Sequence, residues 1–119
     1  MICGVGIDII ELNRVEALIR RNERFIDRIL TENEQRKFHC LSDHRKVEYI
    51  AGRFAAKEAF AKAIGTGIGE LGFKDIEIIN NAHGAPHMKV NGFNDKVIHL
   101  SISHSKTYAV ANVILETHE

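Results

Sequence analysis

Apolar side chains from Val47 to Gly65 repeat with the period of a helix that is buried along most of its length. At about 100° per residue, one side of this helix gathers Val47, Ile50, Ala51, Phe54 and Ala61. The half from Phe54 to Ile64 is apolar on its other flanks too, and its only charges are Lys57, Glu58 and Lys62. Glu58 falls within about 20° of Val47, in the middle of the apolar stripe. A carboxylate on a buried face needs a partner, so Glu58 belongs either to a functional site or to a simple ion pair with Lys62.

The rest of the chain alternates between strand and helix patterns. A β-branched run at residues 2–10 predicts a strand, and residues 11–28 predict one helix or two helices broken near Asn22. Thr31 and Glu34 have the spacing of a capping box, which starts a short helix to about His39. Ser42 or Asp43 is the expected N-cap of the long helix, and Gly65 its C-cap. Further strands are predicted at residues 75–80, 87–90, 97–104 and 108–115, the last two forming a hairpin.

The first strand carries a second acidic side chain inside an apolar element. Gly4 and Gly6 indicate that another part of the chain approaches its backbone closely. Asp8 lies on the same face as these glycines, and it is either the N-cap of the following helix or a ligand. Two carboxylates in apolar elements, Asp8 and Glu58, favour a shared site for a hard cation such as Mg²⁺.

Two groups of basic residues suggest anionic partners. On a continuous helical wheel for residues 11–28, one arc collects Arg14, Arg20, Arg21, Arg24 and Arg28. This face suits an acidic protein surface or phosphates, although a solvated amphipathic helix would have the same pattern. Arg45 lies in the first turn of the long helix, where a bound anion would favour a cation, and Arg53 extends the same patch. His104 ends a strand beside a turn, within reach of a bound phosphate.

Length and composition indicate a single cytoplasmic domain covering residues 1–119. Basic and acidic side chains both number 16, so the net charge gives no indication of nucleic-acid binding. Only two cysteines are present, which points to a reducing compartment. The chain's first residues do not resemble a secretory leader, so we expect none, and no apolar run reaches the roughly 20 residues that span a membrane.

Three blocks of the sequence resemble the short 4'-phosphopantetheinyl transferases, the holo-[acyl-carrier-protein] synthase family. They are GIDIIEL at residues 6–12, GRFAAKEAFAKAIGTGIG at residues 52–69 and SISHSKTYAVA at residues 101–111, in the family's order. The resemblance implies an α+β fold, with a small antiparallel sheet packed by one long helix and shorter helices. It also implies transfer of the 4'-phosphopantetheine arm of coenzyme A to a serine of apo acyl carrier protein, for fatty acid biosynthesis. Gly84-Ala85-Pro86 departs from the family's usual Gly-Lys-Pro, so no residue is assigned to the adenine end.

The resemblance also implies roles for individual residues. Asp8 and Glu58 correspond to magnesium ligands, and Lys62 and His104 to positions that contact phosphate, as do Arg45, Arg53 and Lys57 more loosely. Arg14, Arg21 and Arg24 lie where the family docks its carrier protein. Glu58, Lys62 and His104 would act in catalysis, with either Glu58 itself or a water on the metal accepting the serine proton.

Assembly and two rival functions complete the expectations. The final hairpin is apolar on both faces, and the helices can cover only one of them, unless the segment 73–90 folds over the other. The resemblance favours a homotrimer whose active sites are shared between neighbouring chains. A non-catalytic module that binds coenzyme A or a nucleotide would have the same anion patch, and a regulatory protein would use only the arginine face.

Overall fold

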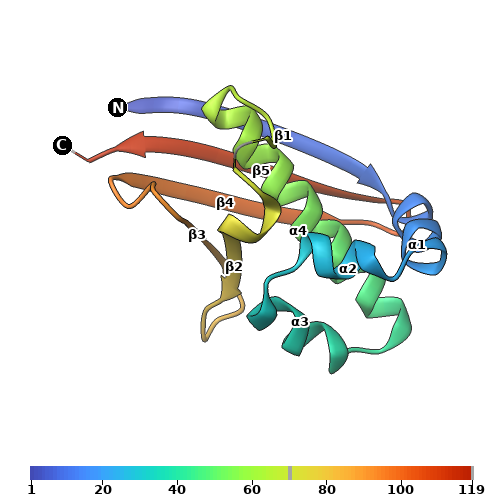
Figure 1. The fold of residues 1–119 in the computed structure, drawn as a ribbon. Coiled ribbons are helices and arrows are strands. Elements are labelled where there is room, and N and C mark those ends of the chain that lie inside the picture. The colour runs from blue at the N-terminus through green and yellow to red at the C-terminus, as the bar shows by residue number, and fades with distance from the viewer. Residues whose placement is uncertain (70, 119) are drawn as a thin grey trace.

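The computed structural model describes residues 1–69 and 71–118 and has the predicted α+β architecture (Figure 1). The elements in chain order are β1 (Ile2–Glu11), α1 (Leu12–Arg21), α2 (Arg24–Ile29), α3 (Glu32–His39), α4 (Asp43–Ile64), a 3₁₀ turn η1 (Phe73–Asp75), β2 (Ile76–Asn80), β3 (Pro86–Val90), β4 (Lys96–His104) and β5 (Tyr108–Thr117). Strands β1, β5 and β4 form an antiparallel sheet in that order, and β2 and β3 form a separate hairpin. The long helix α4 crosses the three-stranded sheet.

Helix α4 begins and ends at the residues that the sequence predicts. Ser42 is its N-cap, and Gly65 ends it in the left-handed conformation with φ of +82°, which glycine adopts without steric cost. Between these ends, Ala59 and Phe60 pack in one buried cluster with Val113 of β5 and Ile78 of β2. The helix therefore joins the sheet and the hairpin through a common core.

Strand β1 passes so close to α4 that only glycine fits at two positions. A Cβ atom on Gly6 would lie 1.9 Å from the carbonyl oxygen of Ala59, and one on Gly4 would lie 2.3 Å from that of Ala63. Both distances are far below van der Waals contact, so the close approach predicted from these glycines is confirmed. This packing brings Asp8, two residues beyond Gly6 on the same face, against the second half of α4.

The basic segment after β1 forms two short helices, so the alternative of one continuous helix is wrong. The break lies at Asn22, whose side-chain Oδ1 accepts a hydrogen bond of 3.0 Å from the backbone N–H of Arg24. The predicted capping box of α3 is confirmed, because Thr31 and Glu34 exchange hydrogen bonds between side chain and backbone. Glu11, not Asp8, is the N-cap of α1, so the alternative role of Asp8 as a cap is excluded.

The fully buried charge of α4 is Lys57, not Glu58 as the helical wheel suggested. The Lys57 side chain is 0% exposed, and its Nζ donates to Glu34 Oε1 at 2.6 Å and to the carbonyl oxygen of Ile29 at 2.7 Å. Glu34 Oε2 accepts from the backbone N–H of Ile78 at 2.9 Å. Burial lowers the pKa of Lys57, and the charge of Glu34 partly offsets this effect. The pair joins α3, α4 and β2 inside the protein.

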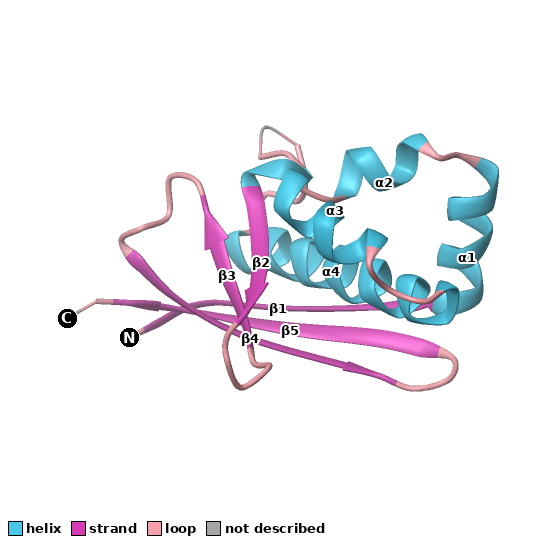
Figure 2. Ribbon diagram, turned by 90° about the horizontal axis from the view of Figure 1, so that it is seen from below, coloured by secondary structure: helices cyan, strands magenta, loops and turns pink. Residues whose placement is uncertain are grey.

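One face of the three-stranded sheet is left open by the described part of the chain. Figure 2 shows the helices together on the other side of this sheet. On the open face, the β1 side chains of Val5, Ile7 and Ile9 are each about 60% exposed. The β2–β3 hairpin packs in the core beside α4, so the segment 73–90 does not cover the open face. None of the described helices is long and apolar enough to cross a membrane.

Candidate functional site

A cleft of about 910 Å³ lies where the start of α4, the β2–β3 turn and the end of β4 meet. Three residues predicted from the sequence to contact phosphate line it together: Arg45, Arg53 and His104. Lys37, from the end of α3, adds a fourth basic side chain. The cleft therefore combines cations from elements that are far apart in the chain, as binding of a multiply charged anion requires.

Arg53 is held rigidly in the wall of this cleft. Only 8% of the residue is exposed, and its Nη2 donates to Asn80 Oδ1 at 2.7 Å. The guanidinium lies 3.9 Å from the centre of the Tyr49 ring, a stacking arrangement that suits arginine. Its Nε is buried without a hydrogen-bond partner among the described residues. A buried donor of this kind is costly to leave unpaired, and an acceptor atom of a ligand would satisfy it.

The His104 ring stands at the end of β4, beside an acidic residue. Glu48 Oε2 lies 3.4 Å from His104 Nδ1 and 3.5 Å from Nε2 of His44, one turn earlier on α4. The sequence analysis missed Glu48, since its spacing from His44 looks like an ordinary exposed helix pair. It also missed Asn80, because the partner of a buried arginine is set by the packing of β2 on α4.

A second cluster of charges forms where β1 crosses α4. Lys62 Nζ donates to Asp8 Oδ1 and to the carbonyl oxygen of Ile7, both at 3.0 Å. Lys62 is therefore paired with Asp8, and the alternative ion pair between Glu58 and Lys62 is not formed in the described residues. Burial raises the pKa of Glu58, the charge of Asp8 raises it further, and Lys62 opposes both effects.

These two carboxylates fit the requirements of a magnesium ion. Mg²⁺ is held by one or two carboxylates, while water and substrate phosphates complete its octahedral shell. Burial is the main cause of the raised pKa of Glu58, and repulsion from Asp8 adds to it; a cation between the two carboxylates would relieve that repulsion. No group of three or more His, Cys, Asp or Glu side chains that could hold a metal occurs in the described part of the chain.

The two clusters lie on different sides of α4. At 3.6 residues per turn, Glu58 points about 140° and Lys62 about 180° away from Arg53 around the helix axis. Neither these residues nor Asp8 lines the cleft. A phosphate bound by Arg53 therefore cannot touch Lys62 of the same chain.

The other expected site residues divide into buried and exposed positions. Lys57 is enclosed with Glu34, so its position does not fit the expected phosphate contact. Arg14, Arg21 and Arg24 are exposed on α1 and α2, although the break at Asn22 means that they do not share one straight helix face.

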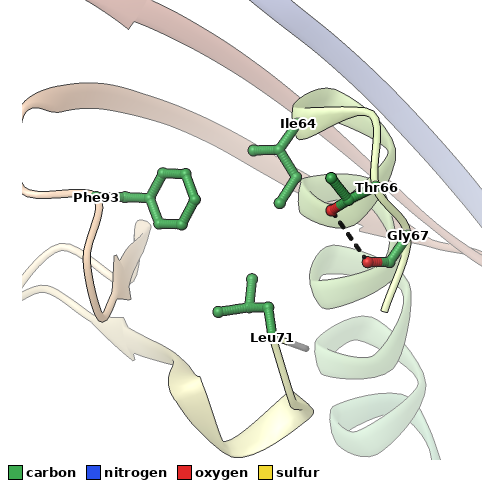
Figure 3. A pocket seen from close by; sticks show the side chains of 5 residues that line it. All are labelled: Ile64, Thr66, Gly67, Leu71 and Phe93. Atoms are coloured by element: carbon green, nitrogen blue, oxygen red, sulfur yellow. Dashed lines mark hydrogen bonds between the residues drawn. The ribbon is translucent and has the colours of Figure 1, made fainter. Parts of the chain in front are cut away.

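A second hollow, of about 630 Å³, lies at the end of α4 and has a different character (Figure 3). It is lined by Ile64, Thr66, Gly67, Leu71 and Phe93. The side chains of Ile64, Leu71 and Phe93 surround the hollow in Figure 3. None of the described lining residues carries a charge, so the hollow does not share the anion-binding character of the cleft.

Nearly the whole chain is similar to known proteins of one family. Residues 4–113 match the 4'-phosphopantetheinyl transferase superfamily. A holo-[acyl-carrier-protein] synthase of Oceanobacillus iheyensis is 84% identical over 119 residues, covering 100% of both chains, and one of a Geobacillus species is 62% identical over 117 residues, covering 98% of each. The crystal structure of a holo-(acyl-carrier-protein) synthase from Bacillus anthracis in complex with CoA (3',5'-ADP) has a TM-score of 0.93 and 52% identity, and the match covers 99% of each chain. The chain therefore belongs to the 4'-phosphopantetheinyl transferase superfamily.

Proposed function

We propose that this chain transfers the 4'-phosphopantetheine arm of coenzyme A to a serine hydroxyl of apo acyl carrier protein, releasing adenosine 3',5'-bisphosphate. The observation that carries the proposal is the cleft in which Arg45, Arg53 and His104 meet. The similar structure from Bacillus anthracis, which is in complex with CoA (3',5'-ADP), supports a nucleotide ligand of this charge. We place the reaction in fatty acid biosynthesis in the cytoplasm.

In this proposal the cleft holds the bisphosphate end of coenzyme A. Arg53 is pre-organised by Asn80 and Tyr49, so little side-chain entropy is lost when its free Nε meets a phosphate oxygen. Arg45 and His104 add charge at the exposed rim. Cations fixed in place stabilise the negative charge that develops on a departing phosphate, and so assist both binding and bond cleavage.

The cluster on the other side of α4 would handle the reacting phosphate. Asp8 and Glu58 would hold Mg²⁺, which when bound polarises the phosphoryl group and offsets its charge. Lys62, already in contact with Asp8, would neutralise oxygens of the pyrophosphate. Glu58, directly or through a water, would accept the proton of the attacking serine.

Both clusters can serve one substrate only if two chains meet. We propose a homotrimer in which Asp8, Glu58 and Lys62 of one chain face the cleft of the next. The open face with Val5 and Ile7 supports this assembly, since a contiguous exposed apolar surface usually marks an interface. The separation of the two clusters around α4 also supports this assembly, because one substrate cannot contact both clusters of the same chain.

The exposed arginines would bind the carrier protein. Arg14, Arg21 and Arg24 lie on α1 and α2, which follow directly from the strand that carries Asp8. Arginine forms bidentate contacts with carboxylates, so this surface suits an acidic partner protein. A carrier protein docked there would approach the metal-binding cluster with its serine.

Mass spectrometry of apo acyl carrier protein tests the proposal. Incubation with the enzyme, coenzyme A and Mg²⁺ is expected to add one phosphopantetheinyl group, and omission of any one of the three should abolish the gain. A protein that binds coenzyme A in calorimetry but leaves the carrier protein unmodified would be a non-catalytic binding module. Absence of both effects would contradict a role for the cleft in coenzyme A binding.

A further inference from the structure

Glu48 is the one acidic side chain among the described residues that line the cleft. Its neighbours there include three cations, Lys37, Arg45 and Arg53, as well as His104. A carboxylate at this place repels the phosphates that the cleft is proposed to bind. An acid in an anion site therefore calls for a function that outweighs the repulsion.

The contacts of Glu48 point to His104 as its target. Glu48 Oε2 lies 3.4 Å from His104 Nδ1, and no other ion pair and no hydrogen bond to that ring is formed among the described residues. The Glu48 side chain is only 19% exposed, whereas the His104 side chain is half exposed at the last residue of β4. A fixed carboxylate thus lies beside an imidazole that little else restrains.

His44 gives a built-in comparison. Its Nε2 lies 3.5 Å from the same Oε2 atom, but its side chain is 82% exposed and does not line the cleft. An ion pair with an exposed side chain contributes little to stability, because solvent screens it and ordering that side chain costs entropy. The Glu48 carboxylate is therefore shared by one histidine at the cleft and one outside it.

We propose that Glu48 is a positioning residue that holds the Nδ1 side of the His104 ring and so presents Nε2 to a phosphate oxygen in the cleft. Which nitrogen of a histidine carries the proton is set by the contact that the other nitrogen makes. With Nδ1–H facing Glu48, Nε2 faces the cleft; when the ring takes up a proton from solvent at Nε2 on binding of a phosphate, it has a donor on each side. This inference rests on the proposed function for its ligand, but the ring orientation is a property of the free protein.

Calorimetry of adenosine 3',5'-bisphosphate binding distinguishes two effects of Glu48. Loss of its positioning of His104 weakens binding, whereas loss of its repulsion of phosphate tightens binding. If Glu48 acts through His104, Glu48→Ala should weaken binding by roughly 3- to 10-fold, the contribution of one hydrogen bond. Glu48→Gln should weaken it less, since an amide oxygen in the same place can also face Nδ1–H. In a His104→Gln background, Glu48→Gln should instead tighten binding, because only repulsion remains. His44→Gln is the matched control and should leave the affinity unchanged.

Nitrogen-15 spectra of the imidazole give a readout that does not depend on any ligand. At a pH where the ring is neutral, wild-type His104 should carry its proton on Nδ1, and Glu48→Ala should shift it toward Nε2, the form favoured in solution. An unchanged tautomer, or tighter binding by Glu48→Ala, would overturn the positioning role. Failure of the wild type to bind the bisphosphate would instead refute the proposed function, and the spectra would still decide what Glu48 does to the ring.

Discussion

Mixing two inactive variants tests whether the active site is shared between chains. Glu58→Gln removes a carboxylate from the cluster beside β1, and Arg45→Glu reverses a charge at the cleft on the other side of α4. Both side chains are at least partly exposed, and no hydrogen bond or ion pair to either is formed within the described residues. Each variant should therefore fold normally and be inactive alone.

The expected recovery follows from the arrangement of the two clusters. A site formed by Glu58 of one chain and Arg45 of the next is intact only when the first chain is the Arg45→Glu variant and the second is Glu58→Gln. At equal amounts and random assembly, about 25% of the sites in a closed ring satisfy both conditions. The activity should follow the product of the two fractions and be highest at equal mixing.

Two measurements make this experiment decisive. The chains are unfolded and refolded together, native mass spectrometry verifies mixed assemblies, and modification of apo carrier protein gives the activity. As a control, wild type is mixed in equal amount with the double variant Glu58→Gln/Arg45→Glu. If sites are shared, the mixture should have about a quarter of the activity of the same amount of pure wild type, and not the half that independent wild-type chains would give.

A site contained within one chain gives the opposite results. No chain in the first mixture would have both groups intact, so the activity would stay at the background level at every ratio. In the control, the wild-type chains would keep their full activity. Either outcome in verified mixed assemblies, or an active monomer in light scattering, would refute the shared site.

Three further predictions address separate parts of the molecule. Asp8→Asn and Glu58→Gln should each abolish transfer. The pKa of Glu58 is raised in the folded chain, so the protonated side chain favours folding, and this stability is lost as pH rises through that pKa. Glu58→Gln should therefore have a higher melting temperature than wild type at neutral pH. Arg21→Glu should raise KM for carrier protein, but not for coenzyme A, in steady-state assays at low salt, and equal effects on both would indicate fold damage. Lys57→Met should lower the free energy of unfolding in urea by about 3–5 kcal/mol, because it leaves the buried Glu34 without its cation; a loss below about 1 kcal/mol would contradict this.

Features set by neighbours in the chain were predictable from the sequence. The ends of α4, the capping box of α3 and the alternating strands β4 and β5 depend on side chains within a few residues of each other. The glycines of β1 were also informative, since a strand loses packing where it has no side chain unless another backbone takes that space. For Gly6 that backbone is the carbonyl of Ala59.

Features set by distant packing were not predictable in the same way. A helical wheel gives the angles between Lys57 and Glu58, but it does not say which angle faces the β2–β3 hairpin. That choice depends on Glu34, which supplies the partner that lets Lys57 be buried. The contact of Glu48 with His104 likewise depends on where β4 ends against α4, so no local pattern indicates it.

The positions of the charged residues around α4 support the proposal that a second chain completes the site. Arg53 and Lys57 project to the side that faces β2, while Glu58 and Lys62 project toward β1. A helix packed on both sides is rigid, so no local motion brings the two groups together. Burial of Lys57 with Glu34 fixes the rotation of α4 and with it both half-sites. The apolar face around Ile7 is then consistent with docking of a second copy, because a chain that completed its own site would gain nothing from leaving it open.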